Sequence, residues 1–316
     1  MRITHAAICG SDLWFYRGVT QWVPGDRTGH EFIGVVEELG SEVRSIRRGD
    51  RVIAPFVISD GTCEFCDVGL HTSCQRGQSW GDDANGAQAE AVRVPLADGT
   101  LVRMTPAIAE DNRKPKSALS LTDVMSTGQH GTVSAGARQG GTIAVIGDGA
   151  VGLCAVLSAR RLGLEHIISI GHNARRLRLA QEFGATATFD SRDAEVAQQV
   201  IEATRGGALC VVEAVGGQES IDLALRIVRD GGTVSFVGVP HGVGALDMRR
   251  LFSGNVALRG ALAPARAYIP ELLRDVESGK LDPSPIFDMR LPLDRVAEGY
   301  AAMDERTAIK VLLEVS

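Results

Sequence analysis

Three cysteines lie close together in residues 59–74, which read SDGTCEFCDVGLHTSC. Cys63, Cys66 and Cys74 follow the spacing C-x2-C-x7-C, and three thiolates this close in sequence supply most of the ligands of a tetrahedral zinc ion. Such a site needs a fourth ligand, and His71 in the same segment is one candidate. Without a fourth ligand, the three cysteines would be ordinary thiols or would hold a labile metal.

A second pattern with chemical meaning is AVIGDGAVGL, which places Gly147, Gly149 and Gly152 in the register G-x-G-x-x-G. The pattern follows a predicted strand and opens a predicted helix, which is the context in which it binds a dinucleotide. Gly147 permits the tight turn, Gly149 lets the backbone approach a pyrophosphate, and Gly152 lets the helix pack on the strand. The first helical amides, at Ala150 and Val151, would bind the pyrophosphate. We therefore expect a nucleotide site here rather than a merely structural turn.

The end of the next predicted strand bears on which dinucleotide is bound. NAD sites usually carry Asp or Glu here to accept a hydrogen bond from the ribose 2′-hydroxyl, whereas this chain has Gly171. His172, Arg175 and Arg176 follow, and cations without a carboxylate suit a 2′-phosphate. The arginines could also be a solvated helix start. The sequence favours NADP over NAD.

The pattern of apolar residues differs between the first and second parts of the chain. Short β-branched runs separated by turn residues fill the first hundred positions: EFIGVVEEL, DRVIAPFVI and AEAVRVPL. From Gly141 onward, six apolar runs alternate with helical stretches: GTIAVIG, HIISIG, ATATFD, ALCVVEAV, GGTVSFVGV and VALRGAL. This alternation predicts an α/β domain with a doubly wound parallel sheet. After Pro264, a helix-like segment precedes a terminal strand that we expect to return to the first domain.

Length and charge limit the classes of protein that this chain can belong to. A chain of 316 residues suggests two domains, and a net charge of −6 gives no support for binding nucleic acid or an anionic membrane. The start, MRITHAAICG, lacks the pattern of a secretory signal, and the most apolar stretch is interrupted by Asp148 and glycines. We expect a cytoplasmic protein, in which Cys154 and Cys210 fill the core rather than form disulfides.

Taken alone, Cys9 and His30 would more often be core residues than metal ligands. Three segments of the sequence favour the ligand role. They are ICGSDLWFYRG, PGDRTGHEFIGVVEELG and DVMSTGQHG. Together these segments resemble the zinc-dependent medium-chain alcohol dehydrogenases, and the resemblance extends over nearly the whole chain. It implies that Cys9 and His30 are ligands of a catalytic zinc, with Glu31 as a carboxylate in or beside the coordination sphere. It also implies that Asp123, where relatives carry Cys or Asp, is the third ligand.

The chemistry of this ligand set agrees with the resemblance. Zinc held by a thiolate, an imidazole and a carboxylate keeps an open position, which is typical of a catalytic site. An alcohol bound there loses its proton readily and can pass hydride to a nicotinamide, and the reverse reaction reduces an aldehyde or ketone. The resemblance implies that Ser11 takes the alcohol proton, although it could be a turn-stabilising serine. Relatives often continue this relay to a histidine where this chain has Trp14, which could instead line the substrate pocket.

The family often carries a second, structural zinc held by cysteines spaced C-x2-C-x2-C-x7-C. Aligning the last three on Cys63, Cys66 and Cys74 places Asp60 at the first position, and a carboxylate is an acceptable zinc ligand. We expect a structural zinc at these four residues. The alternative is that Asp60 only caps the turn SDGT.

The resemblance also implies a domain organisation. A β-rich, GroES-like catalytic domain would comprise residues 1–126 and 266–316, with the zinc lobe near 60–74, and a Rossmann domain would comprise residues 127–265. A homodimer or homotetramer is expected. Relatives carry a hairpin before the segment of Cys9, and without it we expect an uncovered strand edge and a lower stability or activity.

The predicted function is therefore that of a zinc-dependent oxidoreductase, which transfers hydride between a small alcohol, or its aldehyde or ketone, and NADP or NAD. One alternative is a zinc-free quinone or enoyl reductase of the same fold, against which Cys9, His30 and Asp123 argue. Another is a non-catalytic relative that keeps the fold and the cofactor site.

Overall fold

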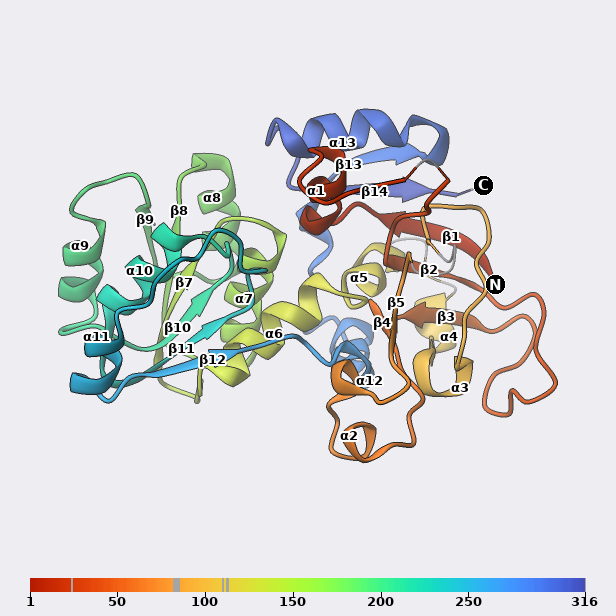
Figure 1. The fold of residues 1–316 in the computed structure, drawn as a ribbon, viewed down its shortest axis with the longest axis horizontal. Helices are drawn as coiled ribbons and strands as arrows, with labels where there is room; N and C mark the ends of the chain where they lie inside the picture. The colour runs from red at the N-terminus through yellow and green to blue at the C-terminus, as the bar shows by residue number, and fades with distance from the viewer. Residues whose placement is uncertain (24, 82–85, 110, 112–113, 316) are drawn as a thin grey trace. The chain divides into compact units, whose positions relative to one another are not determined.

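The computed structural model describes residues 1–23, 25–81, 86–109, 111 and 114–315. The chain divides into two compact units, which are described separately (Figure 1). The first unit comprises Met1–Ser126 and Pro264–Ser316, and the second comprises Thr127–Ala263. The second unit is thus inserted into the sequence of the first.

A six-stranded sheet in the order β13-β14-β1-β2-β3-β6 forms the centre of the first unit. Its strands are β1 (Arg2–Ala7), β2 (Glu31–Val35), β3 (Arg51–Ala54), β6 (Val102–Arg103), β13 (Phe287–Pro292) and β14 (Lys310–Glu314). The terminal strand β14 pairs with β1 antiparallel and with β13 parallel, so the expected return to the first domain is confirmed. Alternate residues such as Ile3, Phe32 and Val52 are fully buried and form the core on this sheet.

The expectation of a strand in AEAVRVPL (residues 89–96) is wrong. Only one isolated bridge forms there, between Arg2 and Ala91. Pro95 has no N–H to donate to a ladder, and Leu96 takes a left-handed conformation with φ 49° that turns the chain into a short helix. The apolar side chains of this run still pack against the core, which accounts for the misleading pattern.

Short elements complete the first unit and surround its sheet. The strands β4 (Val57–Ile58) and β5 (Gln78–Ser79) form a small separate ladder. The helices are α1 (Leu13–Tyr16), α2 (Glu64–Asp67), α3 (Ala97–Thr100), α4 (Pro106–Ala109), α5 (Pro115–Ser120), α12 (Ala265–Glu277) and α13 (Val296–Asp304). The 3-10 turns are η1 (Gly10–Asp12), η2 (His71–Ser73), η4 (Ser284–Ile286) and η5 (Leu293–Arg295).

A six-stranded parallel sheet forms the centre of the second unit, in the order β12-β11-β10-β7-β8-β9. Each of the six predicted apolar runs overlaps one of its strands, although β11 begins three residues before its run: β7 (Thr142–Ile146), β8 (His166–Gly171), β9 (Ala187–Asp190), β10 (Ala208–Glu213), β11 (Val228–Phe236) and β12 (Ala257–Gly260). Counted from β7 as the first, the order is 3-2-1-4-5-6, which is that of dinucleotide-binding sheets. The order reverses between β7 and β10, and ligands bind at such a switch point.

Helices connect these strands. They are α6 (Val124–Ser134), which leads into the second unit, α7 (Ala150–Arg161), α8 (Ala174–Phe183), α9 (Val196–Ala203), α10 (Gln218–Ile227) and α11 (Met248–Ser253). Helix α8 has a clear start and end, because Asn173 Oδ1 accepts from the N–H groups of Arg175 and Arg176, and Gly184 ends the helix at φ 118°. Cys154 and Cys210 are buried in this unit, and all six cysteines of the chain are free of disulfides, as expected.

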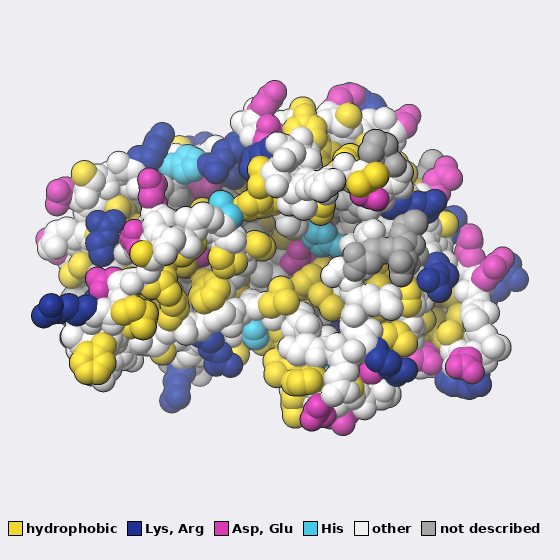
Figure 2. All heavy atoms as spheres, in the orientation of Figure 1, with side chains coloured by type: hydrophobic (Ala, Val, Ile, Leu, Met, Phe, Trp, Pro, Cys, Tyr) yellow, Lys and Arg dark blue, Asp and Glu magenta, His cyan; other side chains and the backbone are white. Residues whose placement is uncertain are grey.

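Two further observations concern the charges on one face of the molecule and the length of its helices. Acidic and basic side chains are intermixed on the face shown in Figure 2, without a large field of one sign. Among the described residues, no helix has both the length and the apolar character needed to span a membrane.

Candidate metal centres and nucleotide site

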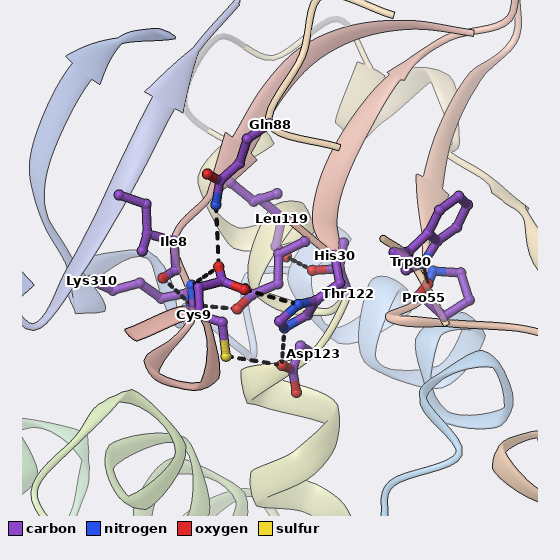
Figure 3. A network of polar contacts seen from close by, with 12 residues as sticks. Ile8, Cys9, His30, Pro55, Trp80, Gln88, Leu119, Thr122, Asp123 and Lys310 are labelled. Atoms are coloured by element: carbon purple, nitrogen blue, oxygen red, sulfur yellow. Dashed lines mark hydrogen bonds and ion pairs between the residues drawn. The ribbon is translucent and has the colours of Figure 1, made fainter. Parts of the chain in front are cut away.

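One cluster of potential metal ligands lies in the first unit and comprises Cys9, His30, Glu31 and Asp123. One ligand atom from each side chain lies within 4.8 Å of all the others. Cys9 Sγ is 3.6 Å and His30 Nε2 is 3.4 Å from Asp123 Oδ2, and Figure 3 shows the three side chains converging. The structure therefore brings together the four residues that the sequence suggested for a catalytic metal.

Strand pairing explains why residues so far apart in sequence meet. Ala7 at the end of β1 pairs with Glu31 at the start of β2. Cys9 lies two residues after β1 and His30 one residue before β2, so both lie at the same edge of the sheet. Asp123 immediately precedes α6. Three separate chain segments thus deliver one ligand set to one place.

The pKa values of these groups reflect a crowded and buried donor set. Burial raises the pKa of the Cys9 thiol, and it also raises the pKa of Glu31, although Lys310 opposes the latter effect. Burial opposes protonation of His30, but Asp12 and Cys9 outweigh it and raise the pKa of His30 well above the usual range. A divalent cation would replace the protons that these groups otherwise share.

The cluster fits a zinc ion by the nature and the state of its donors. Sulfur, imidazole nitrogen and carboxylate oxygen are the three donor types that zinc prefers. Glu31 Oε2 is buried and has no hydrogen-bond partner, which is costly unless the oxygen faces a cation.

Asp12 supports the cluster and was not suggested by the sequence. This residue is only 3% exposed, and its Oδ1 lies 3.4 Å from His30 Nδ1. Its Oδ2 accepts hydrogen bonds from Cys9 N at 2.9 Å and from Gln88 Nε2 at 3.2 Å. A carboxylate on the far nitrogen of a ligating histidine fixes the ring orientation and raises its basicity. The available signal was the position of Asp12, three residues after Cys9, where its side chain can accept from the backbone of that cysteine.

Lys310 is a second supporting residue that the sequence did not reveal. Its Nζ lies 2.6 Å from Glu31 Oε1. It also donates to the carbonyl oxygen of Ile8 at 3.2 Å, and Figure 3 shows Lys310 beside Ile8. Lys310 is 1% exposed and Glu31 is fully buried. Glu31 raises the pKa of Lys310 above its usual range, although burial opposes this effect. No local pattern in the sequence links a lysine in the last strand to a glutamate in the second.

Ser11 and Trp14 lie next to this cluster in sequence. Ser11 is part of η1, between Cys9 and Asp12, and is partly exposed. Trp14 belongs to α1 and is also partly exposed, whereas Phe15 and Tyr16 are 41% and 49% exposed. An apolar and aromatic surface therefore begins five residues after the first ligand.

A second cluster of four potential ligands comprises Asp60, Cys63, Cys66 and Cys74, and its ligand atoms also lie within 4.8 Å of one another. Cys63 Sγ is 3.6 Å from Cys66 Sγ and 3.8 Å from Cys74 Sγ. His71 is not in this group, and its Nδ1 faces the carbonyl oxygen of Gly69 at 3.2 Å. The three sulfur atoms and one carboxylate match the donor set of a closed zinc site.

Asp60 caps a turn and also lies beside the three sulfur atoms of this lobe. Its Oδ1 accepts from the N–H groups of Thr62 at 2.8 Å and Cys63 at 3.0 Å, which is the turn-capping role. Its Oδ2 accepts from Arg76 Nε at 3.0 Å, and its own N–H points to Cys74 Sγ at 3.2 Å. These hydrogen bonds, that of Thr62 first, hold the pKa of Asp60 well below its usual range, so the carboxylate is charged. Capping the turn and facing the sulfur atoms are therefore compatible.

The glycine-rich turn of the second unit joins β7 to α7 at the switch point of the sheet. Gly147 has φ 117°, a conformation that favours glycine. A Cβ on Gly152 would lie 1.9 Å from the carbonyl oxygen of Gly147, so the helix approaches the strand too closely for any side chain. A Cβ on Gly149 would meet nothing within 4 Å, and α7 begins at the next residue, Ala150, followed by Val151. This open cradle at a helix start fits a pyrophosphate.

Beyond this turn lie the residues expected to contact the adenosine ribose. Gly171 is the last residue of β8, and His172 follows it, partly exposed. Arg175 is exposed in the first turn of α8, whereas Arg176 is buried and its Nη1 lies 3.7 Å from Asp148 Oδ1. Arg176 is therefore not part of a solvated helix start.

Comparison with known proteins agrees with these observations. Residues 1–105 match the model of the alcohol dehydrogenase GroES-like domain, and residues 150–278 match that of the zinc-binding dehydrogenases. A protein of Mycobacterium tuberculosis named a probable zinc-binding alcohol dehydrogenase is 38% identical over 312 residues, which are 96% of this chain and 78% of that protein. The chain belongs to the zinc-dependent medium-chain alcohol dehydrogenases.

Other members of this family extend the comparison. The alcohol dehydrogenase TADH from Thermus sp. ATN1 superposes with a TM-score of 0.92 at 36% identity, covering 100% of this chain and 91% of that one. The NADP-dependent isopropanol dehydrogenase of Clostridium beijerinckii is 32% identical over 281 residues, which are 85% of this chain and 78% of that protein. The expected fold class, a GroES-like domain with a Rossmann domain, is confirmed. So is the expected class of enzyme, a zinc-dependent alcohol dehydrogenase that uses NAD(P) and a small-molecule substrate.

Proposed function

We propose that Cys9, His30 and Asp123 hold the catalytic zinc of this alcohol dehydrogenase, with Glu31 beside them. The observation that carries the proposal is the convergence of all four ligand atoms within 4.8 Å at one sheet edge. Zinc with an open coordination position acidifies a bound alcohol and polarises a carbonyl, and a bound nicotinamide exchanges the hydride.

The side chains around the cluster would prepare it for this chemistry. Asp12 holds the imidazole of His30 and the backbone N–H of Cys9 in place through its two oxygens. Lys310 neutralises Glu31 and leaves one carboxylate oxygen, Oε2, without a protein partner and able to face the cation. Ser11, in the turn that directly follows Cys9, would accept the alcohol proton.

We further propose that Asp60, Cys63, Cys66 and Cys74 hold a structural zinc. Three thiolates and a carboxylate carry the same formal charge as four thiolates, and a closed set of four protein ligands leaves no position for a substrate. Two zinc ions per chain are then expected.

We propose NADP as the preferred cofactor, bound at Gly147, Gly149, Ala150, Val151 and Gly152. Support comes from the end of β8, where Gly171 offers no carboxylate to a ribose 2′-hydroxyl and His172 follows. Arg176 contributes through Asp148, with which it pairs, rather than as a direct contact to a phosphate. The NADP-dependent relative from Clostridium beijerinckii agrees with this preference.

One set of measurements tests these proposals. The metal content of the full chain should be about two zinc ions, and oxidation of a series of small primary and secondary alcohols should be faster with NADP than with NAD. In the Asp123→Asn variant, the rate should fall at least about a hundredfold while the affinity for NADP is kept, because the two sites use different residues. Faster turnover with NAD would contradict the cofactor preference, and full activity of Asp123→Asn would contradict the ligand set.

A further inference from the structure

Asp148 and Gly171 lie against each other where β7 and β8 end. Asp148 stands between the first two glycines of the turn and is 6% exposed. A Cβ added to Gly171 would lie 2.5 Å from Asp148 Cβ and 2.7 Å from its Oδ2. The backbone of Gly171 is that of an ordinary strand, without a positive φ, so it would accept any residue. The side chain of Asp148, rather than backbone strain, therefore keeps position 171 a glycine.

The carboxylate of Asp148 faces the turn that follows β8 and the start of α8. Its Oδ2 accepts hydrogen bonds from the backbone N–H groups of His172 and Asn173, both at 2.8 Å. Its Oδ1 lies 3.7 Å from Nη1 of the buried Arg176. Since Oδ2 accepts two backbone N–H groups and Oδ1 faces a buried guanidinium, we expect Asp148 to hold this turn rather than to accept from a ribose hydroxyl.

We propose that the pair Asp148 and Gly171 determines which adenosine ribose this enzyme accepts. Asp148 is a positioning residue: it holds the backbone of His172 and Asn173, and it excludes an acidic side chain from position 171. The turn therefore presents no carboxylate to the 2′ position, where a phosphate would be repelled by one. This inference rests on the proposed nucleotide site and names the residues that set its preference.

Mutual exclusion makes a clear prediction for substitutions. Gly171→Asp alone places a second carboxylate against the first, so both sterics and charge oppose it. Asp148→Ala alone removes the acceptor of two backbone N–H groups. Combined, Asp148→Ala opens the space that an aspartate at 171 needs, and the new carboxylate can accept from a 2′-hydroxyl. The two substitutions must therefore be strongly non-additive.

The test uses the full chain and two small probes that contain the adenosine ribose, adenosine 2′,5′-bisphosphate and 5′-AMP, with titration calorimetry. The natural chain should prefer the bisphosphate. Gly171→Asp should bind both probes more weakly and should melt at a lower temperature than the natural chain. The double variant Asp148→Ala/Gly171→Asp should recover most of that melting temperature and shift the ratio of the two affinities toward AMP by about tenfold or more. Asp148→Asn keeps one acceptor oxygen, so it should retain more affinity for both probes than Asp148→Ala.

A matched control is Glu182→Gln, which removes an exposed carboxylate on α8 and should change neither the ratio nor the melting temperature. The natural chain, the two single variants and the double variant form a double-mutant cycle. Additive effects on the melting temperature and on the affinity ratio would overturn the inference, and so would a Gly171→Asp variant that behaves like the double variant. The melting temperatures report the exclusion without any substrate or metal. If the variants show the expected non-additive effects but the natural chain does not oxidise alcohols, the proposed function is contradicted and this inference is not.

Discussion

The ammonium group of Lys310 lies 2.6 Å from the carboxylate of Glu31, although 279 positions separate the two residues in sequence. Both side chains are almost completely buried, so water screens neither charge. The pair joins the last strand of the first unit to the proposed zinc cluster. Its energetics can be separated from zinc binding by working with the metal-free chain.

Lys310→Met should strongly destabilise that metal-free chain, because it leaves the carboxylate of Glu31 buried and unpaired. The loss in free energy of unfolding should be about 3–5 kcal/mol in urea titrations. The double variant Lys310→Met/Glu31→Gln should recover part of this loss, since no charge is left behind. Lys280→Met, at an exposed lysine, is the control. A loss for Lys310→Met no larger than that of the control would show that the pair contributes little.

Asp12→Asn should weaken the binding of the catalytic zinc by about 10–100-fold. The substitution keeps the shape of the side chain but removes the charge that faces His30 Nδ1 at 3.4 Å. Competition with a chelator of known affinity measures the effect, and Asp294→Asn, at an exposed aspartate, serves as the control. Equal zinc affinity in the Asp12→Asn variant and the natural chain would mean that His30 needs no carboxylate to hold it.

Asp60→Ala should reduce the metal content from about two zinc ions per chain to about one. Asp60→Cys should retain both, because it completes a set of four thiolates. Arg76→Ala is the matched control: it removes the ion pair to Asp60 Oδ2 but leaves all four ligands in place. Elemental analysis after dialysis gives the numbers. If Asp60→Ala keeps two zinc ions, the three cysteines suffice and Asp60 is only a turn cap.

Asp98 should make the stability of the first unit depend on pH. Its carboxylate accepts from Ser45 Oγ at 2.5 Å and from the N–H groups of Ser45 and Arg44, both at 2.8 Å. These hydrogen bonds, that of the Ser45 hydroxyl first, lower the pKa of Asp98 in the folded chain below its value in the unfolded chain. Its contribution is therefore fully present above the unfolded pKa of about 4 and is lost as the pH falls through the folded pKa.

Asp98→Asn should accordingly cost about 0.5–1 kcal/mol at pH 7, a modest value because the site is partly exposed. The difference from the natural chain should shrink as the pH is lowered below about 4. Urea titrations at several pH values measure it. A difference that stays constant with pH would show that the charge of Asp98 does not matter.

The residues that the sequence revealed share one property: their signal is local. Each strand of the second unit overlaps a short apolar run that is followed or preceded by a helix, and the glycines of the nucleotide turn lie within six positions. Cys63, Cys66 and Cys74 likewise lie within one short segment. Cys9, His30 and Asp123 are dispersed, and the resemblance to a family, rather than any periodicity, brought them together.

What the sequence did not reveal depends on contacts between distant segments. Lys310 has the appearance of an ordinary residue in a strand until β14 is placed beside β1. Asp148 looked only like a polar residue that interrupts an apolar run, and its contact with Gly171 requires the register of β7 against β8. The prediction of a strand in residues 89–96 was wrong although its signal was local. Its pattern was local and strand-like, but its only ladder contact is the single bridge at Ala91.

The position of β14 between β13 and β1 imposes an order of events during synthesis. The second unit is one continuous segment and is complete once residue 263 has left the ribosome. The sheet of the first unit still lacks two neighbouring strands at that point, and Glu31 still lacks Lys310. We therefore expect the nucleotide-binding half to fold first and the metal cluster to mature only when β14 has been made. Glu31, made early in the chain, therefore stays without its buried ion-pair partner until Lys310 has been added nearly 280 positions later.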